Sequence, residues 1–254
     1  MKIKLLIAVL LLGVTAQLYG QDRGVYRAGY LRLGVNTIGD PLMQDLSPKE
    51  NIFDGRYGAS RGYTFEFGHI FYFGGKNSQS VMNLGLDWTI LSLNYNKLEK
   101  WKAYGENSGA RNVEIGGEKI AFAGRTKLGP VLSMNLGGSV LLDVRFQIAP
   151  TIRYFDFNYS ENAGEVNERY FSYVNNDEED NDVDYDPEAI KNRLAFGVAK
   201  SYGATLRRKA LGLSVDYVVG QVKSPYEARN SGFNTSGKEK IQSNSLHFTV
   251  NFTF

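Results

Sequence analysis

The sequence predicts an all-β protein in which eight antiparallel strands close into an up-and-down barrel that crosses a membrane. Apolar and polar residues alternate with a period of two along most of the chain, as in strands with one apolar face. The connections between these strands alternate between long and short. The chain has 28 Gly, 16 Tyr and 15 Phe against 6 Pro, a composition that favours strands and turns.

The alternation is clearest between Val140 and Arg153. One face of this segment carries Leu142, Val144, Phe146 and Ile148, and the other carries Asp143, Arg145, Gln147 and Thr151. The polar face also holds many glycines along the chain, and the interior of an eight-stranded barrel is only wide enough for packed side chains. We therefore expect the charged face to line the interior and the apolar face to contact lipid, the reverse of a soluble barrel.

Eight strands are predicted, with bounds good to about 2–4 residues. Pro130 lies in the fourth and cannot donate to a ladder, so it predicts a bulge or a strand end there. The first strand shows the least regular alternation. The predicted strands are 25–35, 61–73, 79–95, 118–133, 139–155, 191–207, 211–223 and 241–254.

The predicted connections alternate in length along the whole chain. The short ones are Gly74–Ser78, Met134–Gly138 and Arg208–Ala210, and the long ones are 36–60, 96–117, 156–190 and 224–240. Bacterial outer-membrane barrels have this pattern, with short periplasmic turns, long outer loops and an even number of strands.

Residues 1–20 have the pattern of a secretory signal peptide. A basic start with Lys2 and Lys4 precedes an apolar run from Leu5 to Val14 and then small residues through Gly20. The run of about ten residues is too short for a membrane helix. The predicted organisation is therefore a signal peptide over 1–20 and one barrel domain over 21–254, exported to the cell outer membrane.

Composition narrows the possible chemistry. There is no Cys, which excludes disulfides and thiolate sites, and the two His leave little for a metal centre. Without Lys2 and Lys4, basic residues fall from 29 to 27 and equal the 27 acidic ones. This balance gives no sign of the basic surface that binds nucleic acid. The mean hydropathy of −0.31 does not exclude a membrane barrel, because only every second residue of a barrel strand faces lipid.

The chain resembles the small eight-stranded outer-membrane barrels of the OmpA-barrel and OmpX-like kind. The features that carry the resemblance are the signal peptide, the alternating strands, the loop asymmetry and an aromatic C-terminal strand ending in Phe254. In that family a final strand of this kind is read by the barrel-assembly machinery. The resemblance implies this role for Leu246, Phe248, Val250, Phe252 and Phe254, although the final strand here lacks an internal Gly.

Nine charged residues are expected to face the interior as an ion-pair network, because ionisable groups at membrane depth are costly unless paired. Such a network either plugs the barrel or forms a charged constriction for small solutes. We favour the plug, since eight strands leave little bore. The nine are Glu66, Asp87, Arg125, Lys127, Asp143, Arg145, Arg153, Arg193 and Asp216.

His247 and Thr249 share the inward face of the last strand. Some barrels similar to this one are lipid A deacylases with a Ser-His pair and an acid, so a lipid-modifying enzyme is an alternative. Thr stands in place of Ser and the sequence places no carboxylate beside the pair, so we expect no enzyme and an ordinary interior histidine. His69 is expected on the lipid face, near an interface.

The connection 156–190 is strongly acidic. Asp180, Asp182 and Asp184 have the spacing that opens a calcium loop, but Tyr185 occupies the position that requires Gly. A solvated acidic run is the simpler interpretation, and Ca²⁺ here or bridging to lipopolysaccharide is an alternative. We expect no other cofactor.

The predicted function is a structural or interaction anchor that displays four outer loops. Its expected partners are outer-membrane lipid and lipopolysaccharide, the assembly machinery and an unknown extracellular partner, and a narrow channel is the alternative. Aromatic and charged loop residues are the usual contact makers, which points to Phe53–Tyr57, Trp101–Tyr104, Tyr170–Tyr185 and Tyr226–Phe233. Ligand and oligomeric state are not encoded in any recognisable motif.

Overall fold

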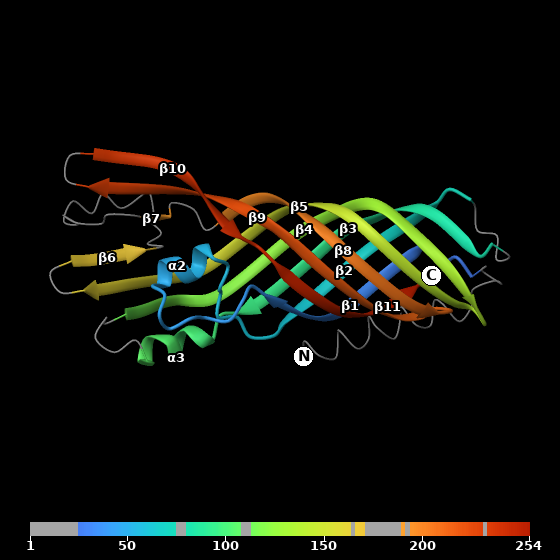
Figure 1. The fold of residues 1–254 in the computed structure, drawn as a ribbon, viewed down its shortest axis with the longest axis horizontal. Helices are drawn as coiled ribbons and strands as arrows, with labels where there is room; N and C mark the ends of the chain where they lie inside the picture. Colours follow the sequence, from blue (N-terminus) through green and yellow to red (C-terminus); the bar gives the residue numbers. More distant parts are fainter. Residues whose placement is uncertain are drawn as a thin grey trace, which may run out of the picture.

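The protein is a closed ring of eight antiparallel strands (Figure 1). The computed structural model describes residues 25–74, 80–107, 113–163, 166–170, 189–190, 194–230 and 233–254. Around the ring each strand pairs with its two neighbours, and the last pairs with the first through Tyr30 opposite Thr253 and Ile38 opposite Ser245. The ring runs in order through β1 (Gly29–Ile38), β2 (Gly62–Tyr72), β3 (Met82–Lys97), β4 (Val113–Gly137), β5 (Val140–Ala163), β8 (Leu194–Arg208), β9 (Leu211–Asn230) and β11 (Ser245–Thr253).

The two ends of the barrel differ, as the loop lengths predict. At the turn end, β4 and β5 are joined at Gly137 and Gly138, whose φ angles of +89° and +57° suit residues without a Cβ. The turn between β8 and β9 lies at the same end. At the opposite, loop end lie α2 (Pro48–Phe53) and α3 (Lys100–Asn107) (Figure 1).

The strands are longer at the loop end than the sequence predicts. β5 and β9 continue past the ring and pair with β6 (Val166–Tyr170) and β10 (Phe233–Gln242), forming hairpins that project from the loop end (Figure 1). A short β7 (Ala189–Ile190) also pairs with β9. The predicted loops 156–190 and 224–240 are thus partly strand.

Two of the expected loops contain helices. The sequence 36–60 holds α2, whose N-terminus has a capping box in which the Ser47 hydroxyl accepts from the Glu50 N–H and the Glu50 carboxylate accepts from the Ser47 N–H. The sequence 96–117 holds α3. Among the described residues no helix is both long and apolar enough to cross a membrane.

The expectation that Pro130 marks a bulge or strand end is wrong. Pro130 lies inside β4, opposite Leu86 of β3. The bulge is instead in β3, where the pairing shifts between Thr89 and Ser92 and both Ile90 and Leu91 are exposed. Beyond this bulge the alternation of β3 changes phase, so that Ser92 and Asn94 face inward.

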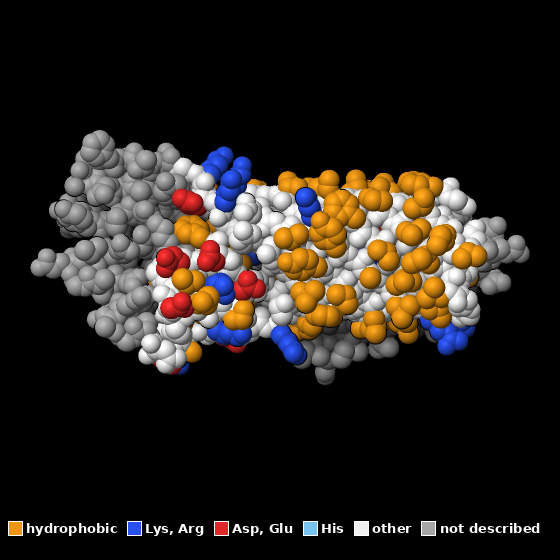
Figure 2. Space-filling view, in the orientation of Figure 1, with side chains coloured by type: hydrophobic (Ala, Val, Ile, Leu, Met, Phe, Trp, Pro, Cys, Tyr) orange, Lys and Arg blue, Asp and Glu red, His pale blue; other side chains and the backbone are white. Residues whose placement is uncertain are grey.

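The barrel is apolar outside and polar inside. On the face that Figure 2 shows, hydrophobic side chains form a broad band over the turn-end part of the wall, and Asp and Glu side chains lie nearer the loop end. Outward residues such as Phe71, Leu213 and Phe248 are exposed, whereas Glu66, Asp87 and Arg145 are buried. A wall of this kind suits lipid rather than water.

Candidate functional site: a sealed, charged lumen

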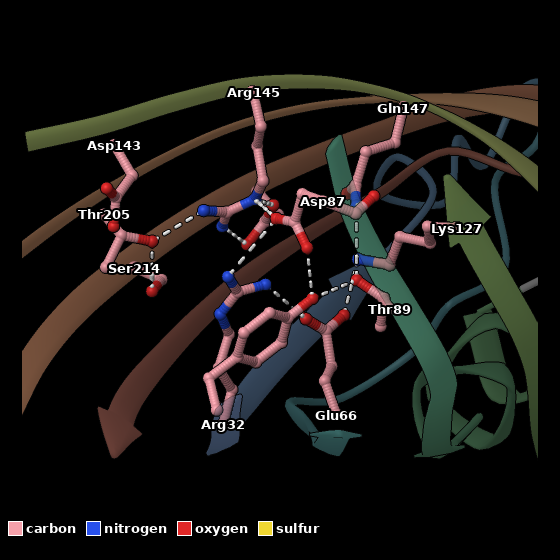
Figure 3. Close-up of polar contacts among 12 residues, drawn as sticks. Arg32, Glu66, Asp87, Thr89, Lys127, Asp143, Arg145, Gln147, Thr205 and Ser214 are labelled. Atoms are coloured by element: carbon pink, nitrogen blue, oxygen red, sulfur yellow. Dashed lines mark hydrogen bonds and ion pairs between the residues drawn. The ribbon is translucent and has the colours of Figure 1, made fainter. Parts of the chain in front are cut away.

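The centre of the lumen contains a connected set of ion pairs (Figure 3). Arg145 of β5 holds Asp216 of β9 through two bonds, from Nη2 to Oδ2 at 2.6 Å and from Nε to Oδ1 at 2.9 Å. Its Nη1 also donates to the Thr205 hydroxyl at 2.6 Å. A planar guanidinium that meets a carboxylate with two parallel bonds fixes the geometry of both partners.

Arg32 joins this pair to a second group of charges. Its guanidinium lies 3.3 Å from Glu66 and 3.7 Å from Asp87. Lys127 Nζ is 2.5 Å from the other oxygen of Glu66. Tyr30 donates to Asp87 at 2.6 Å, and its ring packs under Arg32. Buried charges are tolerated when they are paired and hydrogen-bonded in this way.

A separate cluster lies nearer the turn end. Arg207 Nε donates to Asp143 Oδ2 at 2.7 Å and Nη2 donates to the Tyr72 hydroxyl at 2.8 Å. Ser133 donates to the other oxygen of Asp143 at 2.5 Å. This cluster therefore links four strands by hydrogen bonds, because its residues come from β2, β4, β5 and β8.

Glycines make the space that these side chains occupy. A Cβ at Gly203 would overlap Asp216 Oδ1 and lie 2.6 Å from Arg145 Nε. A Cβ at Gly68 would overlap the Tyr30 hydroxyl. Gly203 therefore makes room for a charged pair, and Gly68 makes room for the Tyr30 side chain, since the interior of an eight-stranded barrel has little free space.

An apolar core closes the loop end of the lumen. We call it the cap, and it brings together residues from β1, the β1–β2 and β3–α3 connections, α2, α3 and the strands β4, β5, β8, β9 and β10. Trp101 Nε1 donates to the Tyr57 carbonyl at 2.8 Å, and the Tyr57 ring stacks on Phe155 with centroids 5.2 Å apart. The buried members are Ile38, Ile52, Tyr57, Leu98, Trp101, Tyr104, Ala121, Phe155, Ala195, Val222 and Ile241.

Hydrogen bonds fix the cap to the strands. The Tyr57 hydroxyl donates to the Gln242 carbonyl, and the Tyr104 hydroxyl donates to the Leu46 carbonyl at 2.5 Å. Burial raises the pKa of Tyr57 to about 12, although the nearby Arg153 guanidinium acts in the opposite direction. Tyr57 is therefore neutral and a hydrogen-bond donor at physiological pH.

Most of the predicted interior charges are where the sequence places them. Eight of the nine are buried in the lumen, and Arg193 lies outside the described residues; the eight are Glu66, Asp87, Arg125, Lys127, Asp143, Arg145, Arg153 and Asp216. The prediction that they all form ion pairs is wrong for Arg125 and Arg153, because Arg32 takes part of the charge of Glu66 and Asp87, and Arg207 pairs with Asp143. Arg32 and Arg207 were not foreseen as members. Their positions in the alternation could have identified them, because Arg32 shares its face with Tyr30 and Arg207 with Ala199.

The last strand presents the predicted outward row. Phe248, Val250 and Phe254 are exposed, Leu246 and Phe252 are half-buried, and the Phe254 N–H donates to the Gly29 carbonyl at 2.9 Å. Phe254 therefore sits at the seam where the ring closes. His69 is half-buried on the outer face beside Phe71, as expected.

The expectation that the Phe53–Tyr57 and Trp101–Tyr104 aromatics form an exposed binding surface is wrong. Tyr57, Trp101 and Tyr104 are each at most 2% exposed, because they form the cap. The segments 171–185 and 231–232, and the side chains of Tyr170, Tyr226 and Phe233, lie outside what the structure describes. So do the signal segment 1–20 and the acidic trio Asp180, Asp182 and Asp184. Among the described residues no group of three or more His, Asp and Glu side chains is placed to hold a metal ion.

His247 has a different neighbour from the one expected. Its Nε2 lies 3.0 Å from the Ser245 hydroxyl, and its Nδ1 lies 3.7 Å from Glu66. The order Ser, His, acid resembles a hydrolase triad, with Ser245 in the position where Thr249 was considered. All three residues are at most 2% exposed, and Glu66 is shared with Lys127.

The fold and the interior together define an eight-stranded, transmembrane-type β-barrel whose lumen is lined with buried charges, most of them paired. No protein-family model matches the chain, and no curated protein matches it. Among solved structures it is similar to Ail, the attachment invasion locus protein of Yersinia pestis, at 7% identity and a TM-score of 0.36, covering 90% of this chain and 99% of Ail. It is also similar to neisserial surface protein A, NspA, at 9% identity and a TM-score of 0.34, covering 89% of this chain and 97% of NspA. The assignment of the fold depends on the strand pairing and not on these scores.

Proposed function

We propose that the protein is an outer-membrane anchor whose barrel is a scaffold and whose loop end is the working surface. It is neither a channel nor an enzyme in this proposal. The observation that carries it is the cap, which joins both helices to the inward faces of the strands above a lumen that contains ion pairs. A pore needs a continuous polar path, whereas here an apolar core lies across it.

The hairpins support the anchor role. β5 with β6 and β9 with β10 project beyond the ring at the loop end (Figure 1). A rigid barrel that holds extended structures at one end is suited to presenting them to a partner. The proposal includes export by residues 1–20, assembly through the C-terminal strand and contact with outer-membrane lipid and lipopolysaccharide.

Conductance separates the anchor from the channel. Purified protein in planar bilayers is expected to show no ion conductance. A Trp101→Ala/Tyr57→Ala variant, which lacks two cap side chains, is expected to keep the ion pairs of the lumen in place. Steady conductance of the wild type that disappears in Arg145→Ala would establish the channel and refute the anchor proposal.

Cross-linking on intact cells tests the working surface. Photo-reactive groups at Lys102 and Glu106 of α3, both strongly exposed, are expected to capture an external macromolecule. The matched control is a group at Ser139 in the turn between β4 and β5, at the opposite end of the barrel. Equal labelling from both ends, or none from α3, would contradict the proposed orientation and role.

A further inference from the structure

Two arginines in the lumen are not part of the ion-pair network. Arg125 of β4 and Arg153 of β5 face inward on adjacent strands and are 3% and 1% exposed. Arg125 lies opposite Thr151 in the strand register, and Thr151 is two residues before Arg153. Arg125 and Arg153 are therefore diagonal neighbours on adjacent strands, at about 7–8 Å. Arg153 is next to the cap, with its guanidinium 5.6 Å from the Tyr57 ring centroid.

Neither guanidinium has a carboxylate partner among the residues that the structure describes. The four other basic residues of the lumen each have one, because Lys127 pairs with Glu66, Arg32 with Glu66 and Asp87, Arg145 with Asp216, and Arg207 with Asp143. In these pairs four carboxylates serve four cations, and among the described arginines of the lumen Arg125 and Arg153 lie outside them.

The nitrogens of these two arginines are largely without acceptors. Arg153 lies against the Tyr57 side chain, but none of its three guanidinium nitrogens makes a well-formed hydrogen bond. Nε and Nη1 of Arg125 make no hydrogen bond either, and Arg125 Nη2 makes one long contact of 3.5 Å with Ser245. Burying a cation without a partner is expensive, and such groups are normally paired or bound to a counter-ion. The donors thus point to a missing acceptor.

The surroundings provide room and a further donor. Arg153 has Ala123 opposite it on β4 and Ala195 opposite it on β8, and Thr151 has Gly197 opposite it. On β3, Asn94 lies opposite Ala123 and its amide nitrogen also lacks an acceptor. Unused donors from three consecutive strands therefore face one part of the lumen, and small residues separate them.

We propose that Arg125 and Arg153 form a binding site for a small oxyanion, of the phosphate class, enclosed between the ion-pair plug and the cap. A guanidinium fork matches two oxygens of such an anion, and two forks match a tetrahedral anion from two sides. The anion completes the charge balance of the lumen and ties β4 and β5 to the underside of the cap. This site is independent of whether the barrel acts as an anchor.

Refolding with and without inorganic phosphate tests the site. Because the cap covers the arginines, phosphate is added during refolding of the full chain into lipid vesicles, at constant ionic strength with chloride as the reference. The wild type is expected to melt about 3–6 °C higher for each tenfold rise in phosphate above its dissociation constant. Native mass spectrometry is expected to show one phosphate per barrel.

Two variants distinguish the site from general salt effects. Arg153→Met is expected to abolish the phosphate dependence and to melt higher than the wild type in chloride alone, because it removes an unpaired buried cation. Lys102→Met, on the exposed face of α3, is expected to keep the full dependence. A wild type that melts identically in phosphate and chloride and carries no adduct would overturn the proposal, and would mean that water alone solvates the two guanidinium groups.

Discussion

Arg145 and Asp216 meet inside the barrel although 71 residues separate them in the chain. They come from β5 and β9, which are not neighbours in the ring, and the contact spans β8 between them. Both side chains are at most 1% exposed. The pair therefore connects three strands across the lumen, and Arg32 links it to Glu66 on the opposite side through Asp87.

Breaking this pair on one side is expected to be strongly destabilising. Arg145→Met leaves Asp216 buried without its partner, which typically costs about 3–5 kcal/mol. The loss is measured from urea unfolding in lipid vesicles. The double variant Arg145→Met/Asp216→Leu is expected to recover much of it, and a double variant as unstable as the single one would show that the unpaired charge is not the cause.

Gly203 is expected to tolerate no side chain. Its Cβ would overlap Asp216 and press on Arg145, so Gly203→Ala should cost about 1–3 kcal/mol through overpacking and a displaced ion pair. The matched control is Gly124→Ala on β4, where the added Cβ would meet only Leu93 Cδ2 at 4.0 Å. Equal stability of the two variants would remove the argument that Gly203 makes room for the pair.

The cap is expected to loosen in alkali through Tyr57. Burial raises the pKa of Tyr57 from 10.0 to about 12. The unfolded chain then loses this proton at lower pH than the folded cap does, so the stabilisation is complete below about pH 10 and is lost as the pH rises toward 12. Fluorescence of Trp101 in a Trp88→Phe background reports the change, because these are the two tryptophans of the chain.

Tyr57→Phe provides the control for this titration. The variant keeps the ring that stacks on Phe155 and loses the ionisable hydroxyl, so its Trp101 signal should change less between about pH 10 and pH 12. Identical alkaline transitions in both proteins would assign the loosening to other groups.

Period-two alternation was enough to predict the ring, because register in a barrel is fixed by which face is apolar. It placed Asp143 and Arg145 correctly, and it could have placed Arg32 and Arg207. It failed where the period is interrupted. The bulge at Ile90 and Leu91 exchanges the inward and outward positions along the rest of β3, and no residue type in the sequence indicates it. Pro130 does suggest an irregularity, but it lies in a regularly paired part of β4.

The cap could not be predicted from local sequence. Trp101 and Tyr104 sit in a charged stretch between two strands, and only the closure of the ring brings them against Phe155 and Ile241. Aromatic residues in loops indicated binding surfaces by general tendency, but tertiary contacts buried them. The contact between Ser245 and His247 has a simpler origin, because Ser245 and Thr249 are both two residues from His247 on the same face of β11, and alternation alone does not distinguish them.

The Ser245, His247 and Glu66 arrangement is expected to be inert. A nucleophile must reach its substrate, and these groups are buried in the lumen, with Arg125 at 3.5 Å from the Ser245 hydroxyl. Ser245 should therefore not react with a fluorophosphonate probe, and Ser245→Ala and His247→Gln should leave the lipid A mass profile of whole cells unchanged. His247→Gln keeps the polar character of the site and isolates the loss of the base. Labelling of Ser245 in the wild type that is abolished in His247→Gln would instead show a working hydrolase.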